Sequence, residues 1–285
     1  MGSALMPSRM IPRGARPWLL LLPAAAFLAA FFVMPLLQVL LLSISDPDWG
    51  LENYAVLFSD GFFLETLATT FLTALTVTVI CLLLAYPLAY AVANRPGPFA
   101  SSALLLVGLS LWLSFLVRTY AWMVILGNRG PVMALLHGLG IDAGELLFTR
   151  FASTLGMVHA LLPIMVMTLY TVMSKIDPAY VRAARGLGAS PLAAFAKVYL
   201  PLSAPAIVNG STLVFITCLG FYVMPVLLGG PREQMIAGLI GQQIEELLNF
   251  GEAAAMSVVL LAASLAIYAL YNRYFGLDRL WGDAR

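Results

Sequence analysis

Charged residues are scarce in this sequence. They make up 10% of its 285 residues, whereas hydrophobic residues make up 61%. A soluble globular domain carries about 25% charged residues, and no water-soluble fold could bury an apolar surface of this size. We therefore expect lipid to surround most of the chain. The formal net charge of +1 gives no indication of a nucleic-acid partner, and none is expected.

Cysteine and histidine are almost absent. Cys81 and Cys218 both fall in apolar stretches, where we expect small buried side chains instead of a disulfide or a metal pair. His137 and His159 are too few and too scattered for a metal site. The sequence also lacks a Gly-x-x-x-x-Gly-Lys-[Ser/Thr] phosphate loop and any Ser-His-Asp set. We therefore expect a protein that is not an enzyme, holds no cofactor or metal and hydrolyses no ATP itself.

What the sequence does contain is six apolar stretches long enough to cross a bilayer, which takes about 20 residues. They run over Trp18–Ser43, Thr66–Ala93, Ser101–Leu126, Phe151–Met173, Ala206–Leu228 and Ala253–Tyr271. The first is about twice as long as the apolar region of a signal peptide, so we interpret it as a retained helix. The expected fold is an all-α polytopic membrane protein, with tails over residues 1–17 and 276–285 and a transmembrane domain over 18–275.

The basic residues predict the orientation of these six helices. With the N-terminus in the cytoplasm, eleven of the fifteen Lys and Arg residues fall in cytoplasmic segments, as the positive-inside rule requires. The opposite orientation would reverse that count. Both termini are therefore expected in the cytoplasm, together with the longest internal polar segment, residues 174–203.

The segment 174–203 has the sequence of a helix, a tight turn and a second short helix. Asp177 is placed to cap the first helix, with Pro178 at its first position. Gly188 permits a positive φ, and Ser190-Pro191 repeats the combination of cap and proline. A short helix that lies across the inner face and is followed by a glycine bend indicates a docking element for a soluble partner.

This segment resembles the EAA loop of permeases of binding-protein-dependent ABC importers. That loop reads Glu-Ala-Ala, three residues, Gly, nine residues, Ile, one residue, Leu-Pro. Here Val198 replaces the isoleucine and Arg182 replaces the acidic residue; the matching positions are Ala183, Ala184, Gly188, Leu200 and Pro201. The resemblance implies that these residues couple the chain to an ATPase subunit. The reversed charge at Arg182 implies either a non-basic partner residue opposite it or a side chain directed to solvent or lipid headgroups.

Two further segments narrow the resemblance. Ser114–Trp122, with the sequence SFLVRTYAW, and Pro225–Pro231, with PVLLGGP, are similar to segments of spermidine/putrescine permeases of the PotB type. This similarity implies a subunit of a bacterial inner-membrane importer for polyamines, or for another small organic solute such as an amino acid. It implies as partners a second homologous permease, a dimer of ATPase subunits that bind ATP and magnesium, a periplasmic solute-binding protein and the lipid bilayer. The alternative, an ion-driven secondary transporter, would be expected to carry more ionisable residues near the midplane.

Four residues of the predicted spans are candidates for the translocation pathway: Arg118, Tyr120, Trp122 and His159. On a continuous third helix, Arg118 would lie about 12 Å before the outer end. It would there reach the outer headgroups, pair with an acid, or line a water-filled vestibule. The aromatic residues either stack on an ammonium group or pack within the bundle. Acidic residues of the outer loops, Glu245 and Glu246 among them, either attract a cationic solute or reflect the exclusion of positive charge from these loops.

Overall fold

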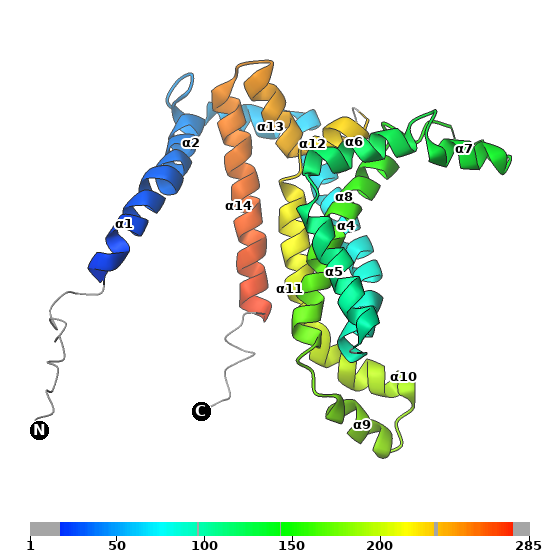
Figure 1. Cartoon of the computed structure of the whole chain (residues 1–285). Helices are drawn as coiled ribbons and strands as arrows, with labels where there is room; N and C mark the ends of the chain where they lie inside the picture. The colour runs from blue at the N-terminus through cyan, green and yellow to red at the C-terminus, as the bar shows by residue number, and fades with distance from the viewer. Residues whose placement is uncertain (1–17, 96, 143, 231–232, 276–285) are drawn as a thin grey trace, which may run out of the picture.

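The computed structural model describes residues 18–95, 97–142, 144–230 and 233–275, and in these ranges it contains helices and no strand (Figure 1). The helices are α1 (Trp18–Leu28), α2 (Met34–Ser45), α3 (Glu52–Ser59), α4 (Gly61–Asn94), α5 (Pro98–Trp112), α6 (Phe115–Leu126), α7 (Pro131–Gly138), α8 (Arg150–Met173), α9 (Pro178–Gly186), α10 (Pro191–Ala194), α11 (Leu200–Leu219), α12 (Val223–Leu228), α13 (Ile236–Glu245) and α14 (Phe250–Phe275). Two π-helical turns join neighbouring helices, Ala29–Val33 between α1 and α2 and Phe195–Tyr199 between α10 and α11. The prediction of an all-α polytopic membrane protein is confirmed.

Helices α4, α8 and α11 form the centre of the molecule, where each packs against the other two. Gly210 of α11 allows a close approach, because a Cβ atom there would lie 2.8 Å from Sδ of Met165 on α8. Cys81 and Cys218 lie in the same core as free, buried side chains, which confirms their predicted role as small apolar residues.

The first and last spans lie to one side of this centre. α14 packs against α2 and α3 and also contacts α11. The junction is tight at Gly251 of α14, where a Cβ atom would collide with the carbonyl oxygen of Asp46. Asn53 of α3 holds the end of α2 by donating from Nδ2 to the carbonyl oxygens of Ser43, at 3.1 Å, and Asp46, at 2.7 Å. α1 leans away from the other helices (Figure 1).

Five segments of the described ranges are long and apolar enough to cross a membrane: Leu22–Ser45, Gly61–Asn94, Arg150–Met173, Pro191–Leu219 and Phe250–Arg273. A sixth span is obtained if α5 and the helices after it are counted together, but this pair is bent by 100°. The predicted third helix, Ser101–Leu126, is therefore not continuous. Ser114 has φ −53° and ψ 136°, outside the helical region, and α6 begins after it without a side-chain cap. Arg118 consequently lies four residues after a bend.

The predicted fifth helix, Ala206–Leu228, also differs from the structure. The spanning helix begins earlier, at Pro191, and ends at Leu219. Gly220 follows it directly, and glycine commonly ends helices. The last residues of the predicted span instead form α12, a separate short helix.

Both ends of the described chain lie at one end of the molecule. Figure 1 shows the start of α1, the end of α14 and the segment from α9 to α10 at the lower end, with α7 and α13 at the opposite end. This arrangement agrees with an even number of crossings, and it places residues 174–203 on the same side as both described chain ends.

Candidate functional site

The polar segment between α8 and α11 begins with a capped helix. Oδ1 of Asp177 accepts a hydrogen bond of 2.7 Å from the N–H of Ala179. Pro178 occupies the first helical position, where its missing N–H costs no hydrogen bond. The structure thus contains the cap that the sequence predicts, and α9 has a fixed starting point outside the spanning helices.

The end of α9 is closed by a glycine turn. Gly188 has a φ of +92°, which lies in the left-handed region that favours glycine. Its N–H donates to the carbonyl oxygen of Arg185, and the N–H of Ala189 donates to that of Ala184, both at 3.0 Å. These two bonds form a Schellman motif. The matched positions Ala184 and Gly188 are therefore parts of one turn, which fixes the direction in which the chain leaves α9.

α9 exposes an apolar face. Tyr180 is 59% exposed, and Leu187, just after the helix, is 91% exposed. At 100° per residue, Tyr180, Ala183 and Leu187 lie along one side of the helix. Arg182 and Arg185 lie on the other side and are also exposed. The helix thus presents one apolar and one basic surface.

The second half of the segment is not the separate short helix that the sequence predicts. α10, the π turn and α11 form one helical segment of 29 residues from Pro191 to Leu219. Leu200 and Pro201 therefore lie inside a helix that enters the core. The π turn just before Pro201 explains why this proline does not end the helix, since local π geometry accommodates a missing N–H.

A cluster of four aromatic side chains packs between this continuous helix and α4. Tyr90 of α4 meets Tyr199 edge to face, with ring centroids 4.8 Å apart, and meets Phe195 in the same way at 5.5 Å. Tyr86, one turn before Tyr90, also contacts Phe195 edge to face. Such pairs contribute about 0.5–1.5 kcal/mol each beyond the burial of their area. The start of the helix over Pro191–Leu219 is thus attached to the C-terminal end of α4.

Two side-chain hydrogen bonds complete this attachment. Nδ2 of Asn94 donates to the hydroxyl of Tyr199 at 2.9 Å, and the hydroxyls of Tyr86 and Ser203 lie 2.8 Å apart. The sequence analysis missed this cluster. The signal that was available is the spacing of four residues within each aromatic pair, which places both rings on one helix face.

The four pathway candidates do not all meet. Trp122 of α6 donates from Nε1 to Nδ1 of His159 on α8 at 3.1 Å. Because the indole N–H can only donate, this bond requires an unprotonated Nδ1 and hence a neutral imidazole. Arg118, one turn before Trp122, is 7% exposed and donates to the carbonyl oxygen of Ser110 on α5. Tyr120 is 57% exposed and does not join this group.

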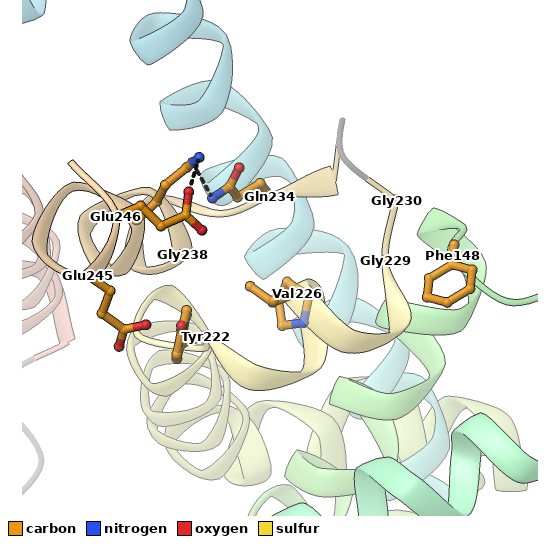
Figure 2. A pocket seen from close by; sticks show the side chains of 11 residues that line it. Phe148, Tyr222, Val226, Gly229, Gly230, Gln234, Gly238, Glu245 and Glu246 are labelled. Atoms are coloured by element: carbon orange, nitrogen blue, oxygen red, sulfur yellow. Dashed lines mark hydrogen bonds between the residues drawn. The ribbon is translucent and has the colours of Figure 1, made fainter.

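A cavity of about 350 Å³ lies at the end of the molecule opposite α9, between α12 and α13 (Figure 2). Tyr222, Glu245 and Glu246 are among the residues that line it. Figure 2 shows a chain of hydrogen bonds on its wall, in which Gln234 donates to Gln242 at 3.4 Å and Gln242 donates to Glu246 at 3.1 Å. The sequence analysis predicted both glutamates as outer-loop acids, with attraction of a cationic solute as one of two alternatives, but it did not predict the cavity. In the described part of the chain, no group of three or more His, Cys, Asp or Glu residues is arranged to hold a metal ion.

Comparison with known proteins places this architecture in a family. Residues 85–277 match the family described as binding-protein-dependent transport system inner membrane component. The spermidine/putrescine transport system permease protein PotB of Salmonella typhimurium is 34% identical over 225 residues, which cover 78% of each chain. PotB of Haemophilus influenzae is 31% identical over 266 residues, which cover 89% of this chain and 92% of that protein.

Solved structures show the same fold. A bacterial alginate ABC transporter in complex with an alginate pentasaccharide-bound periplasmic protein superposes with a TM-score of 0.72 at 18% identity, covering 94% of this chain and 95% of the other. The MetNI methionine ABC transporter superposes with a TM-score of 0.57 at 19% identity, covering 74% and 94%. The chain therefore belongs to the family of binding-protein-dependent transport system inner membrane components, and it is a non-catalytic, multi-pass permease subunit of an ABC importer in the inner membrane.

Proposed function

We propose that this subunit forms part of the membrane path for polyamines or related small amines. Relatives named as spermidine/putrescine permeases are 34% and 31% identical to it over most of its length. The cavity between α12 and α13 supports the proposal of a cationic solute, because Glu245, Glu246 and Tyr222 line it. Carboxylates and aromatic faces are the groups that attract and bind ammonium ions.

In this proposal the chain acts within an assembly. A second homologous permease completes the path, two ATPase subunits bind ATP and magnesium, and a periplasmic protein delivers the solute. The family description supports dependence on a binding protein. The alginate transporter of similar fold was solved in complex with a solute-bound periplasmic protein. We place α9 and both chain ends in the cytoplasm, because the positive-inside rule assigns the basic segments to that side.

α9 and the turn at Gly188 receive the ATPase in this proposal. The observation that carries it is the exposed apolar face of a short helix that is closed at both ends and lies outside the spanning segments. Exposed apolar side chains on one face of such a helix favour a protein partner over water, which supports the proposed docking role. Ala183 lies on that face, and Ala184 and Gly188 form the turn that orients it. Leu200 and Pro201 belong to the helix Pro191–Leu219, which in this proposal transmits movement of α9 to the spanning helices.

Uptake by the complete transporter in liposomes tests this function. The four components are reconstituted with ATP on the side of α9, and labelled putrescine, spermidine and an amino acid are offered with the binding protein. We expect uptake of putrescine or spermidine that requires both ATP and the binding protein. Uptake of the amino acid alone would contradict the assigned solute class. Uptake driven by an ion gradient without ATP would contradict the assigned mechanism.

A further inference from the structure

The bend in the third span separates the last carbonyl groups of α5 from the N–H groups that would pair with them in a continuous helix. α5 has 15 residues, so it is about 22 Å long, which is less than the roughly 30 Å of a bilayer's hydrocarbon core. The segment that follows, Phe115–Gly138, is bent from it by 100°. The carbonyl groups in the last turn of α5 therefore need hydrogen-bond donors from outside their own helix.

Ser110 carries one of these carbonyl groups. In a continuous helix its partner would be the N–H of Ser114, four residues later. Ser114 instead has ψ 136° and begins α6. The guanidinium of Arg118 takes the place of that donor, because its Nη2 donates to the Ser110 carbonyl oxygen across the bend.

The position of Arg118 is unfavourable for α6 and favourable for α5. It is the fourth residue of α6, near the positive end of that helix dipole. Its guanidinium lies at the C-terminal end of α5. That end of the helix dipole carries a partial negative charge, which stabilises a cation. The contact with α5 therefore offsets the cost that the side chain imposes on its own helix.

No acid neutralises this side chain within the described ranges. The ion pair found there joins Arg150 and Glu233 at 3.6 Å, and no carboxylate lies within ion-pair distance of Arg118. Arg118 is 7% exposed, and its Nε is buried without an acceptor. An arginine buried without a carboxylate partner is costly unless its guanidinium finds other hydrogen-bond acceptors. Here the carbonyl oxygen of Ser110, at the end of α5, provides one acceptor.

We propose that Arg118 is a positioning residue that fastens α6 to the end of α5 and sets the angle of the third span. Trp122, one turn later, provides a second attachment by its bond to His159 on α8. α6 is thus held at two consecutive turns, by α5 and by α8. In this assignment Arg118 does not contact the solute, so a polycation does not have to pass an exposed positive charge. The assignment is independent of the solute that the transporter carries.

The angle of the third span can be measured in the assembled transporter. Spin labels on cysteines placed at Leu106 of α5 and Val124 of α6, which are 66% and 69% exposed, report the distance between the two helices. The variant is Arg118→Gln, and the matched control is Arg129→Gln, because Arg129 is exposed. We expect a single narrow distance in the wild type and the control. In Arg118→Gln the distribution should broaden and move to longer distances as the span straightens.

Transport kinetics provide a second readout. If Arg118 positions the helices, Arg118→Gln lowers the maximum uptake rate about tenfold, the factor expected for one charge-assisted hydrogen bond, and leaves the KM and the order of solute preference unchanged. Arg118→Lys keeps the charge but ends one atom shorter, so it should restore part of both the rate and the distance. If Arg118→Gln does not reach the membrane, Arg118→Lys against the Arg129→Gln control decides the question.

Two results would overturn the assignment. One is an unchanged distance distribution in the Arg118 variants. The other is a changed KM or a shifted preference between amines and carboxylate-bearing solutes at unchanged distances, which would make Arg118 a solute contact. Neither result depends on which solute the transporter carries, so a failure here is distinct from a failure of the proposed polyamine transport.

Discussion

Nδ2 of Asn94 and the hydroxyl of Tyr199 are joined by a hydrogen bond of 2.9 Å, across the contact between α4 and the start of α11. Asn94 is the last residue of α4, and Tyr199, 2% exposed, is the last residue of the π turn. The bond thus joins one spanning helix to the point where the docking segment becomes another. A displacement of α9 is expected to reach α4 and α11 together.

Removing this bond should weaken coupling. Tyr199→Phe deletes the hydroxyl while keeping the ring that packs on Tyr90, at an expected cost of about 1 kcal/mol. We expect the number of solute molecules moved per ATP hydrolysed to fall several-fold in liposomes. Tyr268→Phe, which alters a 52% exposed tyrosine of α14, is the control. If both variants moved the same number of solute molecules per ATP, the hydrogen bond would not contribute to coupling.

The turn at Gly188 should be sensitive to the backbone and not to side-chain size. A Cβ atom at Gly188 would meet nothing within 4 Å, so a substitution is penalised only by its φ of +92°. Gly188→Val should therefore cost roughly 1–2 kcal/mol and disturb docking, whereas Gly188→Asn should be milder, because asparagine adopts this conformation more readily. We expect normal membrane insertion in both and ATP hydrolysis without transport in the valine variant. Wild-type uptake in Gly188→Val would refute the docking role.

The two surfaces of α9 should contribute unequally to ATPase docking. Leu187→Asp places a charge on the apolar face, and we expect it to abolish stimulation of the ATPase by the loaded binding protein. Arg182→Glu reverses a charge on the opposite, solvent-facing side, where an ion pair contributes only about 0–1 kcal/mol. We expect stimulation to stay within about fivefold of the wild type, as that small energy implies. A large loss in Arg182→Glu that a compensating change in the ATPase restores would instead show that Arg182 faces its partner.

Thiol labelling checks the orientation in the membrane. A cysteine at Arg185, in α9, should resist an impermeant reagent in intact cells, whereas one at Asp60, before α4, should react. Both positions are exposed, so access depends on the side of the membrane and not on burial. The native cysteines are both buried and should remain unlabelled. Labelling of Arg185→Cys from outside would reverse the topology.

The acidic wall of the cavity should set the apparent affinity for an amine. The double variant Glu245→Gln and Glu246→Gln removes two carboxylates with little change in shape, and we expect it to raise the KM for putrescine about tenfold, as the loss of one charge-assisted contact predicts. Added salt should raise the wild-type KM in the same direction, because it screens the attraction. Glu52→Gln, an exposed acid of α3, is the control. Identical KM values in the double variant and the control would exclude a role for these carboxylates.

The features that the sequence predicted are those that depend on local residues. The cap at Asp177, the proline at Pro178 and the left-handed turn at Gly188 each follow from what one residue type does to the adjacent backbone. The apolar stretches were likewise found by composition alone, because crossing lipid requires little more than length and hydropathy.

The features that the sequence did not predict depend on residues far apart in the chain. Hydropathy reports that residues 101–126 are apolar, but it carries no information on the direction of the helix after Ser114. The bond between Trp122 and His159 joins residues 37 positions apart, and only the packing of α6 on α8 brings them together. The cavity likewise depends on the helix break after Leu219, which brings α12 beside α13.

The continuity of the helix from Pro191 to Leu219 has a mechanical consequence. Its 29 residues give a rod about 43 Å long, and a tilt of about 5° about its docking end would displace the far end by roughly 4 Å. The short link from Gly220 to Tyr222 then passes this displacement to α12, which walls the cavity. If α9 docks the ATPase as proposed, this angular leverage would turn a small tilt at the docking end into a change of several Å in the width of the cavity.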